Sequence, residues 1–165
     1  MPMLHESKDV MAFLDLIALS EGTSTSPATL ANGYDVIVNG IDGNHTISDY
    51  SNHPFASGRD PIVVTTSPRL LKSTASGRYQ ITLPTWQYIV SVDKLPDFQP
   101  GEQDRAALRL LRECGALTSI DNGSISGAIS AASQSWCSFP GSDTRLPKHS
   151  LMWLIGKFKE LRLKF

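Results

Sequence analysis

Apolar residues recur at helical spacing near both ends of the chain. Val10, Leu14 and Ile17 lie four and three positions apart and therefore share one face of a helix. Ser7 is a good N-cap and Gly22 a natural stop, so the pattern predicts a helix from Ser7 to Ser20. The same spacing, with caps and proline at first turns, predicts further helices over residues 67–73, 82–95, 100–115, 122–136 and 150–161.

The middle of the chain has a different texture, rich in β-branched and aromatic residues. The stretches YDVIVNG (34–40) and HTISDYS (45–51) flank a turn-rich connection, which predicts a β-hairpin, and residues 62–65 predict a third strand. The intervening residues 51–61 form a polar loop with Pro and Gly. The chain is therefore predicted to be α+β, mostly α, as one domain over residues 1–165 with a small antiparallel sheet at about 33–65.

Composition excludes few classes of function, but it limits the partners. The chain has 165 residues, 41% of them hydrophobic, and a formal net charge of -1, which gives no electrostatic reason to expect a nucleic-acid partner. The first apolar run is broken by Asp15 and lacks the features of a secretory signal, so we expect no membrane insertion and synthesis in the cytoplasm.

Cysteine and histidine show no metal-ligand spacing, and we expect neither a metal nor a cofactor. Cys114 falls on the apolar side of a predicted helix, which indicates a buried free thiol. The four histidines are expected at the surface or in loops, and they are His5, His45, His53 and His149.

Glu21 is the candidate for acid–base chemistry. It lies four positions after Ile17 and so continues the apolar stripe of the first helix. Burial and the negative end of the helix dipole both disfavour the carboxylate, so both raise the pKa of Glu21 toward that of a general acid. The alternative is a glutamate at a frayed helix end whose carboxylate reaches water.

Two later stretches suit a polysaccharide groove, since sugar rings offer apolar faces for stacking and hydroxyls for hydrogen bonding. LKSTASGRYQI (71–81) combines a tight turn with arginine, tyrosine and glutamine, and SQSWCSFPGS (133–142) places Trp136 before a Phe-Pro-Gly turn. Trp136 as a core residue is the alternative to a stacking surface.

Together these motifs resemble the lysozyme-like lytic transglycosylases, and most closely the lambda-type phage endolysins. The resemblance covers about residues 10–160, in the family's order, and rests on AFLDLIALSEGT (12–23), GYDVIV (33–38), DYSNHP (49–54), LKSTASGRYQ (71–80), GAL (115–117) and SFPG (138–141). It implies a lysozyme-like fold and places the family's catalytic glutamate at Glu21.

The resemblance also implies the reaction. Glu21 would protonate the glycosidic oxygen and then act as base, while the C6 hydroxyl of the sugar attacks C1 to give a 1,6-anhydromuramoyl product. The substrate would be peptidoglycan glycan strands, reached in the periplasm with help from a separate holin, and the protein would act as a monomer. The residues that we expect to bind substrate are Tyr34, Asp35, Tyr50, Ser76, Gly77, Arg78, Tyr79, Gln80 and Trp136.

The chain departs from the family at two places, an apparent insertion FASGRDP (55–61) in the loop 51–61 and the segment that follows SFPG. Loops at these places form lips over the groove in this family, so both loops are expected to flank the cleft. Removal of residues 55–59 is accordingly expected to weaken oligosaccharide binding while leaving the fold intact.

Three alternatives stay open at this point. A true lysozyme would use water as nucleophile with Asp35 or Asp49 as a second carboxylate. A glycan-binding module would keep the fold without turnover, and a phage structural protein would need an assembly region that 165 residues do not suggest.

Overall fold

The computed structural model describes residues 1–4, 6–43, 46–67, 69–142 and 148–165, which form two compact units. The first unit comprises Met1–Glu21 and Asp104–Phe165, and the second comprises Gly22–Gln103. Whether the chain acts as one domain stays a prediction.

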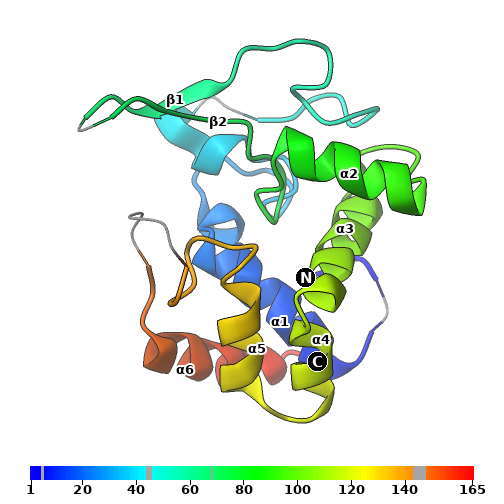
Figure 1. Ribbon diagram of the computed structural model, residues 1–165, viewed down its shortest axis with the longest axis vertical. Helices are drawn as coiled ribbons and strands as arrows, with labels where there is room; N and C mark the ends of the chain where they lie inside the picture. Colours follow the sequence, from blue (N-terminus) through cyan, green and yellow to red (C-terminus); the bar gives the residue numbers. More distant parts are fainter. Residues whose placement is uncertain (5, 44–45, 68, 143–147) are drawn as a thin grey trace. The chain divides into compact units, whose positions relative to one another are not determined.

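The first unit is helical, with α1 as its central element (Figure 1). Its helices are α1 (Lys8–Ser20), the later part of α3 (Pro100–Glu113), α4 (Ala116–Asp121), α5 (Ile125–Ala132) and α6 (Leu151–Arg162). Helix α1 packs against α6 and α4, and α4 and α6 both pack against α5. Phe13 of α1 lies edge-on to Phe139 with ring centroids 6.0 Å apart, and it also contacts Phe158 of α6.

Helix α1 begins and ends where the sequence predicts. The Ser7 hydroxyl accepts a hydrogen bond from the Val10 backbone N–H at 3.3 Å, and Gly22 ends the helix with φ 73°. Every residue from Val10 to Ala18 is buried, so α1 has no solvent face along this stretch. The stripe of Val10, Leu14 and Ile17 is therefore part of a helix that is covered on all sides.

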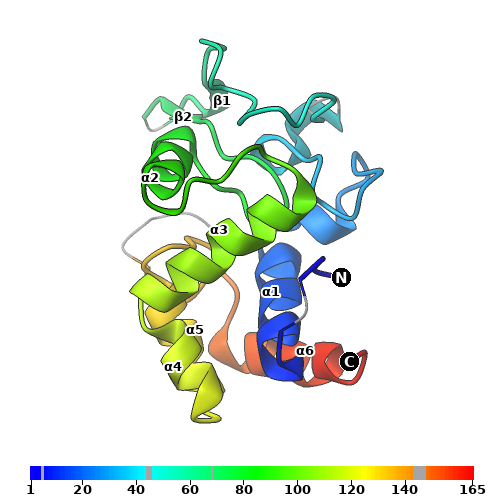
Figure 2. The same cartoon turned by 90° about the vertical axis from the view of Figure 1, so that its right-hand side faces the viewer.

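The second unit contains little regular structure (Figure 2). Its elements are the 3₁₀ helices η1 (Thr23–Thr25) and η2 (Val38–Gly43), the strands β1 (Ile62–Thr65) and β2 (Leu71–Ser73), and α2 (Leu83–Asp93). Strands β1 and β2 pair antiparallel, with Ile62 opposite Ser73 and an irregularity between Val63 and Thr65.

An aromatic cluster forms part of the core of the second unit. The Phe98 ring lies edge-on to Trp86 at 4.7 Å and to His53 at 5.0 Å, measured between ring centroids. Phe55 is also buried and packs beside His53. Removal of residues 55–59 would delete this core phenylalanine, and its burial argues against the prediction that such a deletion leaves the fold intact.

The predicted hairpin at 34–51 is wrong for the described residues. A single isolated bridge, Val36 with Thr46, stands where paired strands were expected, and residues 38–43 form η2. Val38 and Asn39 have φ of 45° and 55°, which no strand allows. The strand predicted at 62–65 is confirmed as β1. The helix predicted over 67–73 is wrong, because Leu71–Ser73 is strand β2, which pairs with β1 and extends the sheet beyond the predicted range of 33–65.

The other predicted helices are confirmed as α2, α3, α5 and α6, and α4 is an additional helix after Gly115. Cys114 and Cys137 are both free and half-buried, so Cys114 is less enclosed than expected. None of the helices in the described part of the chain is long and apolar enough to cross a membrane.

Candidate active site

Glu21 lies at the C-terminal end of α1, held by the helix that precedes it. Its backbone N–H donates to the Ile17 carbonyl at 2.8 Å, and Gly22 then turns the chain away. The residue is half-buried, so the carboxyl group is neither free in solvent nor sealed in the core. This position fits the predicted general acid better than a frayed helix end.

A chain of two side-chain hydrogen bonds ends on the Glu21 carboxyl group. The Ser138 hydroxyl donates to Glu21 Oε1 at 2.6 Å, and the Ser20 hydroxyl donates to Ser138 Oγ at 2.8 Å. The Ser138 backbone also hydrogen-bonds the same carboxyl group. Both serines therefore fix the orientation of one carboxyl oxygen, since each donor has a single acceptor in line.

Burial raises the pKa of Glu21 above its ordinary value because it removes water from the charged form. The two hydrogen bonds from Ser138 act in the opposite direction and stabilise the carboxylate, but burial has the larger effect. The result is a carboxyl group that holds its proton to higher pH than an exposed glutamate, as a general acid requires.

His149 packs at the C-terminal end of α1, and Trp153 packs against His149. His149 Nε2 lies 3.2 Å from the Ser20 carbonyl oxygen, and the His149 backbone N–H donates to the Ser138 carbonyl at 3.0 Å. The His149 ring stacks on Trp153 with ring centroids 4.1 Å apart. Two bonds therefore tie residue 149 to both serines of the Glu21 network.

The sequence did not single out Ser20, Ser138 or His149 as site residues. Ser138 is 117 positions from Glu21, so no local spacing connects them. The available signal was the SFPG motif, whose first residue is Ser138. His149 was expected at the surface or in a loop, and it lies half-buried in the loop segment before α6.

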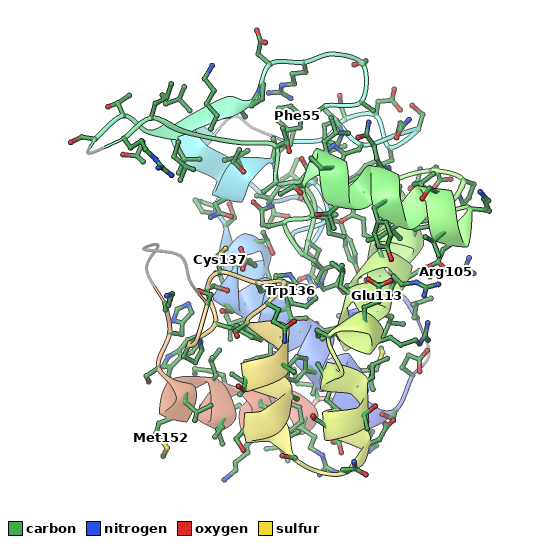
Figure 3. All side chains as sticks on the ribbon, viewed as in Figure 1. Phe55, Arg105, Glu113, Trp136, Cys137 and Met152 are labelled. Carbon is green, nitrogen blue, oxygen red and sulfur yellow. The ribbon has the colours of Figure 1, made fainter. Side chains whose placement is uncertain are left out.

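Glu21 and Trp136 belong to the first unit, whereas the other predicted substrate-binding residues belong to the second. Trp136 lies just after α5 beside Cys137 (Figure 3) and is only 3% exposed. A buried indole ring offers little surface to a sugar, so the structure favours the core alternative for Trp136.

Arg78, Tyr34 and Tyr79 form one buried cluster in the second unit. The Arg78 guanidinium carbon lies 5.2 Å from the Tyr34 ring centroid and 6.0 Å from that of Tyr79. Arg78 Nη1 donates to the Asn32 carbonyl. All three side chains are at most 3% exposed, so in this structure they organise the unit and present little surface to a ligand.

Gly77 and Gln80 lie in a turn that is stabilised by hydrogen bonds of the Gln80 side chain. Gln80 has φ 51°, and its carboxamide accepts from the Asn39 N–H at 2.8 Å and donates to the Gly77 carbonyl at 2.9 Å. Ser76 is buried and bridges Ile37 and Ile81. Gln80 is half-buried and is the member of this turn whose side chain is most exposed.

The two candidate second carboxylates have local structural partners. Asp35 is buried, with Oδ1 accepting from the Thr29 hydroxyl and Oδ2 from the Leu30 N–H at 2.7 Å. Asp49 is exposed and accepts from the Ser51 N–H at 2.8 Å, which lowers its pKa. Tyr50 is half-buried, and burial together with the charge of Asp35 raises the pKa of its phenol.

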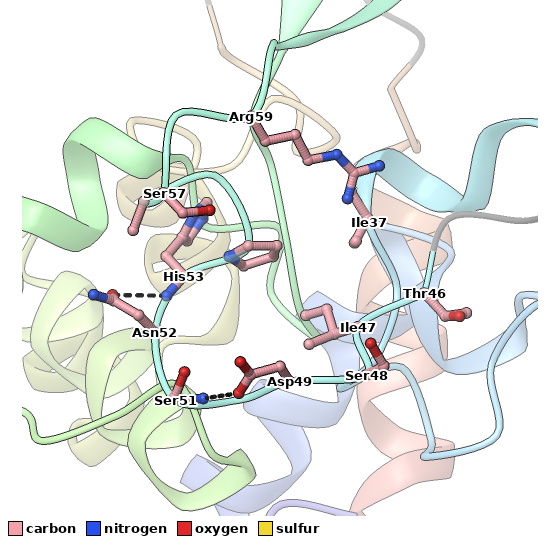
Figure 4. Close-up of a pocket in the computed structure, with 12 residues that line it drawn as sticks. Ile37, Thr46, Ile47, Ser48, Asp49, Ser51, Asn52, His53, Ser57 and Arg59 are labelled. Atoms are coloured by element: carbon pink, nitrogen blue, oxygen red, sulfur yellow. Dashed lines mark hydrogen bonds between the residues drawn. The ribbon is translucent and has the colours of Figure 1, made fainter.

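A pocket of about 360 Å³ lies in the second unit, formed mainly by the segment 46–59 with Ile37 (Figure 4). His53 lines this pocket and lies in a loop, as expected, with its side chain buried. Its Nε2 lies 3.0 Å from the Ile81 carbonyl, and Nδ1 accepts from the Phe55 N–H at 3.3 Å. Burial lowers the pKa of His53 to about 4, so the ring is neutral at pH 7.

Among the residues that the structure describes, no group of three or more His, Cys, Asp and Glu side chains could hold a metal ion. Independence from metals and cofactors stays a prediction.

The family model for endolysins matches residues 11–162, which include Glu21, Ser138 and the turn at 76–80. The chain belongs to the endolysin family. It is 47% identical to the endolysin of Escherichia phage P2 over 156 residues, covering 94% of this chain and 93% of that protein. It is 43% identical to the endolysin of Escherichia phage lambda over 159 residues, covering 96% and 94% of the two chains.

Solved structures agree with this family and establish the fold. The lysozyme of bacteriophage lambda in complex with a chitohexasaccharide matches with a TM-score of 0.82 and 41% identity, covering 96% of this chain and 97% of that one. A second structure of lysozyme from bacteriophage lambda matches with a TM-score of 0.80. The predicted lysozyme-like, mostly helical α+β fold is therefore confirmed, as is membership in a family of peptidoglycan-degrading phage lysis enzymes.

Proposed function

We propose that this endolysin is a lytic transglycosylase. It cleaves the β-1,4 bond between N-acetylmuramic acid and N-acetylglucosamine and leaves a 1,6-anhydromuramoyl end. The observation that carries the proposal is the half-buried carboxyl group of Glu21, whose pKa is raised by burial and which is oriented by the Ser138 hydroxyl at 2.6 Å.

In the proposed reaction, Glu21 carries out both proton transfers and the substrate supplies its own nucleophile. Protonated Glu21 gives its proton to the glycosidic oxygen as the bond from that oxygen to C1 breaks. The C6 hydroxyl of the same muramoyl residue then attacks C1, and the Glu21 carboxylate takes the hydroxyl proton. Because the nucleophile is already part of the substrate, orientation can supply up to about 7–11 kcal/mol of the barrier.

The Ser138 hydroxyl can hydrogen-bond Glu21 both when the carboxyl group is protonated and when it is ionised. Its hydroxyl donates to Glu21 Oε1, and in this proposal Oε2 carries and transfers the proton. After the first transfer, the same hydroxyl donates to a full carboxylate, and a hydrogen bond to an ionised acceptor is stronger than one to a neutral acceptor. The serine therefore stabilises the intermediate state relative to the starting acid.

The local roles of Asp35 and Asp49 favour this chemistry over hydrolysis. A hydrolase usually needs a second carboxylate to act as nucleophile or to activate water. Both oxygens of Asp35 already accept hydrogen bonds from residues 29 and 30, and Asp49 caps the turn at Ser51. A glycosidase that uses one carboxylate has no need of either.

The substrate is proposed from the relatives and from the chemistry of the site. The lambda lysozyme structure contains a chitohexasaccharide, whose β-1,4-linked N-acetylglucosamine units resemble the peptidoglycan backbone. We infer that the chain is made in the cytoplasm, reaches the wall after a separate holin opens the membrane, and acts as a monomer. Expression without a holin should then leave cells intact until the membrane is permeabilised, and sedimentation should give the mass of one chain.

Mass spectrometry of soluble products from purified peptidoglycan tests the proposal. Transglycosylation gives muropeptides one water lighter than those from hydrolysis, with no reducible muramic acid end. Glu21→Gln should release nothing while its circular dichroism matches the parent. Reducible ends as the main product would establish the lysozyme alternative, and binding without release by the parent protein would establish a glycan-binding module.

A further inference from the structure

The pocket in the second unit carries two opposite charges that the proposed reaction does not use. Asp49 and Arg59 both line it, on opposite sides of the opening (Figure 4). A cavity of about 360 Å³ has the size of a small-molecule site, which typically measures about 300–1,000 Å³. The backbone sugars of peptidoglycan are N-acetylated and carry no ammonium group, so a glycan alone gives no reason for this pair of charges.

Both charges are available to a ligand. The Arg59 guanidinium lies 5.1 Å above the Phe55 ring, and no ion pair joins it to a carboxylate within the described ranges. The Asp49 carboxylate is hydrogen-bonded to the backbone and side chain of Ser51 within its own turn, and no cation of a described residue forms an ion pair with it. The side chains of both residues are exposed to solvent.

The wall between the two charges is fixed in place. Asn52 Oδ1 accepts from the Trp86 indole N–H at 3.2 Å and from the His53 N–H at 2.7 Å. His53 and Phe55 are buried beneath the same loop. A ligand would therefore meet a largely preformed surface, which reduces the entropy cost of binding.

We propose that this pocket binds the zwitterionic part of a peptidoglycan peptide stem. The ammonium group of the diamino acid would contact Asp49, its carboxylate would contact Arg59, and its methylene groups would lie against Ile47 and Pro54. The inference rests on the proposed function only in that the stem is attached to the glycan that the enzyme cleaves.

Titration with a sugar-free stem peptide, L-Ala-D-Glu-meso-diaminopimelate-D-Ala, tests the proposal on the full chain. NMR resonances of residues 46–59 should shift, and the affinity should fall about two- to fivefold in each of Arg59→Gln and Asp49→Asn, the range for exposed ion pairs. The side-chain oxygen introduced by Asp49→Asn can still accept the hydrogen bond from the Ser51 N–H, so this substitution keeps the turn. Acetylation of the peptide's free amine on diaminopimelate should weaken binding to the parent and change little in Asp49→Asn.

Arg69→Gln is the matched control, because Arg69 is exposed and does not line the pocket. It should bind the peptide like the parent protein. The proposal is overturned if the peptide leaves residues 46–59 unshifted, or if Arg59→Gln and Asp49→Asn bind it as tightly as Arg69→Gln. It is also overturned if chitohexaose, and not the peptide, loses affinity in the two variants, since the pocket would then be a sugar subsite.

This test does not depend on catalysis. If products prove hydrolytic while peptide binding still requires both charges, the transglycosylase proposal fails and the stem pocket stands. If anhydro products form and the peptide does not bind, the reverse holds.

Discussion

Replacement of Ser138 by alanine should change the pH dependence of lysis as well as its rate. The substitution removes the hydroxyl that donates to Glu21 Oε1 at 2.6 Å and leaves the backbone of the loop unchanged. Because this bond lowers the pKa of Glu21 against the effect of burial, its loss should raise that pKa further.

The size of the effect follows from the bond. A hydrogen bond to a charged group contributes about 1.5–3 kcal/mol, and 1.36 kcal/mol corresponds to one pKa unit. The backbone hydrogen bond from Ser138 remains and offsets part of the loss, so the smaller value is the better guide. The alkaline limb of activity, where Glu21 loses its proton, should therefore move to higher pH. The maximal rate should fall about tenfold, because the carboxylate left after proton transfer has lost a donor.

The assay is release of soluble fragments from purified sacculi between pH 4 and 9. Ser138→Thr keeps a hydroxyl group, so its alkaline limb should match that of the parent and its maximal rate should be close to the parent's. Ser135→Ala removes an exposed hydroxyl in the same segment and should behave like the parent. If a folded Ser138→Ala variant has the parent's rate and the parent's alkaline limb, the role assigned to this hydrogen bond is refuted.

Three further predictions concern the second unit. Gly77→Ala should prevent stable folding, because φ is 76° and a Cβ atom would overlap the carboxamide of Gln103; a cooperative melt at the parent's temperature would contradict this. His53 should make stability fall as pH drops from about 6.5 to about 4, because the unfolded state binds the proton first, with a loss of up to about 3 kcal/mol. Urea unfolding at pH 7 and pH 4 measures this loss, which should be smaller in His53→Gln. Phe55→Ala should lower the free energy of unfolding by about 3–5 kcal/mol, whereas Ala56→Gly beside it should cost about 1 kcal/mol or less, and equal melting temperatures for the two would contradict the burial argument.

The helices were predictable because their signals are local. Ser7, Gly22 and the apolar spacing between them determine α1 within one stretch of sequence, and Glu21 was found from the same count. Helix α6 has an equally local start, since the Ser150 hydroxyl accepts from the Trp153 N–H.

The second unit was mispredicted because distant side chains decide its backbone. Val36, Ile37 and Val38 favour a strand by type, yet Val38 takes φ 45° where the Gln80 carboxamide binds the next N–H. The strand β2 was missed because the cap-like Ser67 suggested a helix start. Ser138 escaped detection for the same reason, since its partner Glu21 is distant in sequence and only folding joins them.

The position of Gln103 restricts how this chain can be recombined with related ones. Its Oε1 accepts from the Arg78 N–H, its Nε2 donates to the Tyr34 and Phe98 carbonyls, and its carboxamide fills the space that a side chain on residue 77 would need. Gly77 and Gln103 must therefore be kept together in any recombined chain, although 25 residues separate them in the sequence. A chimera with a crossover between them should fold only if both parents carry this glycine and this glutamine, whereas a crossover outside the interval leaves the pair intact.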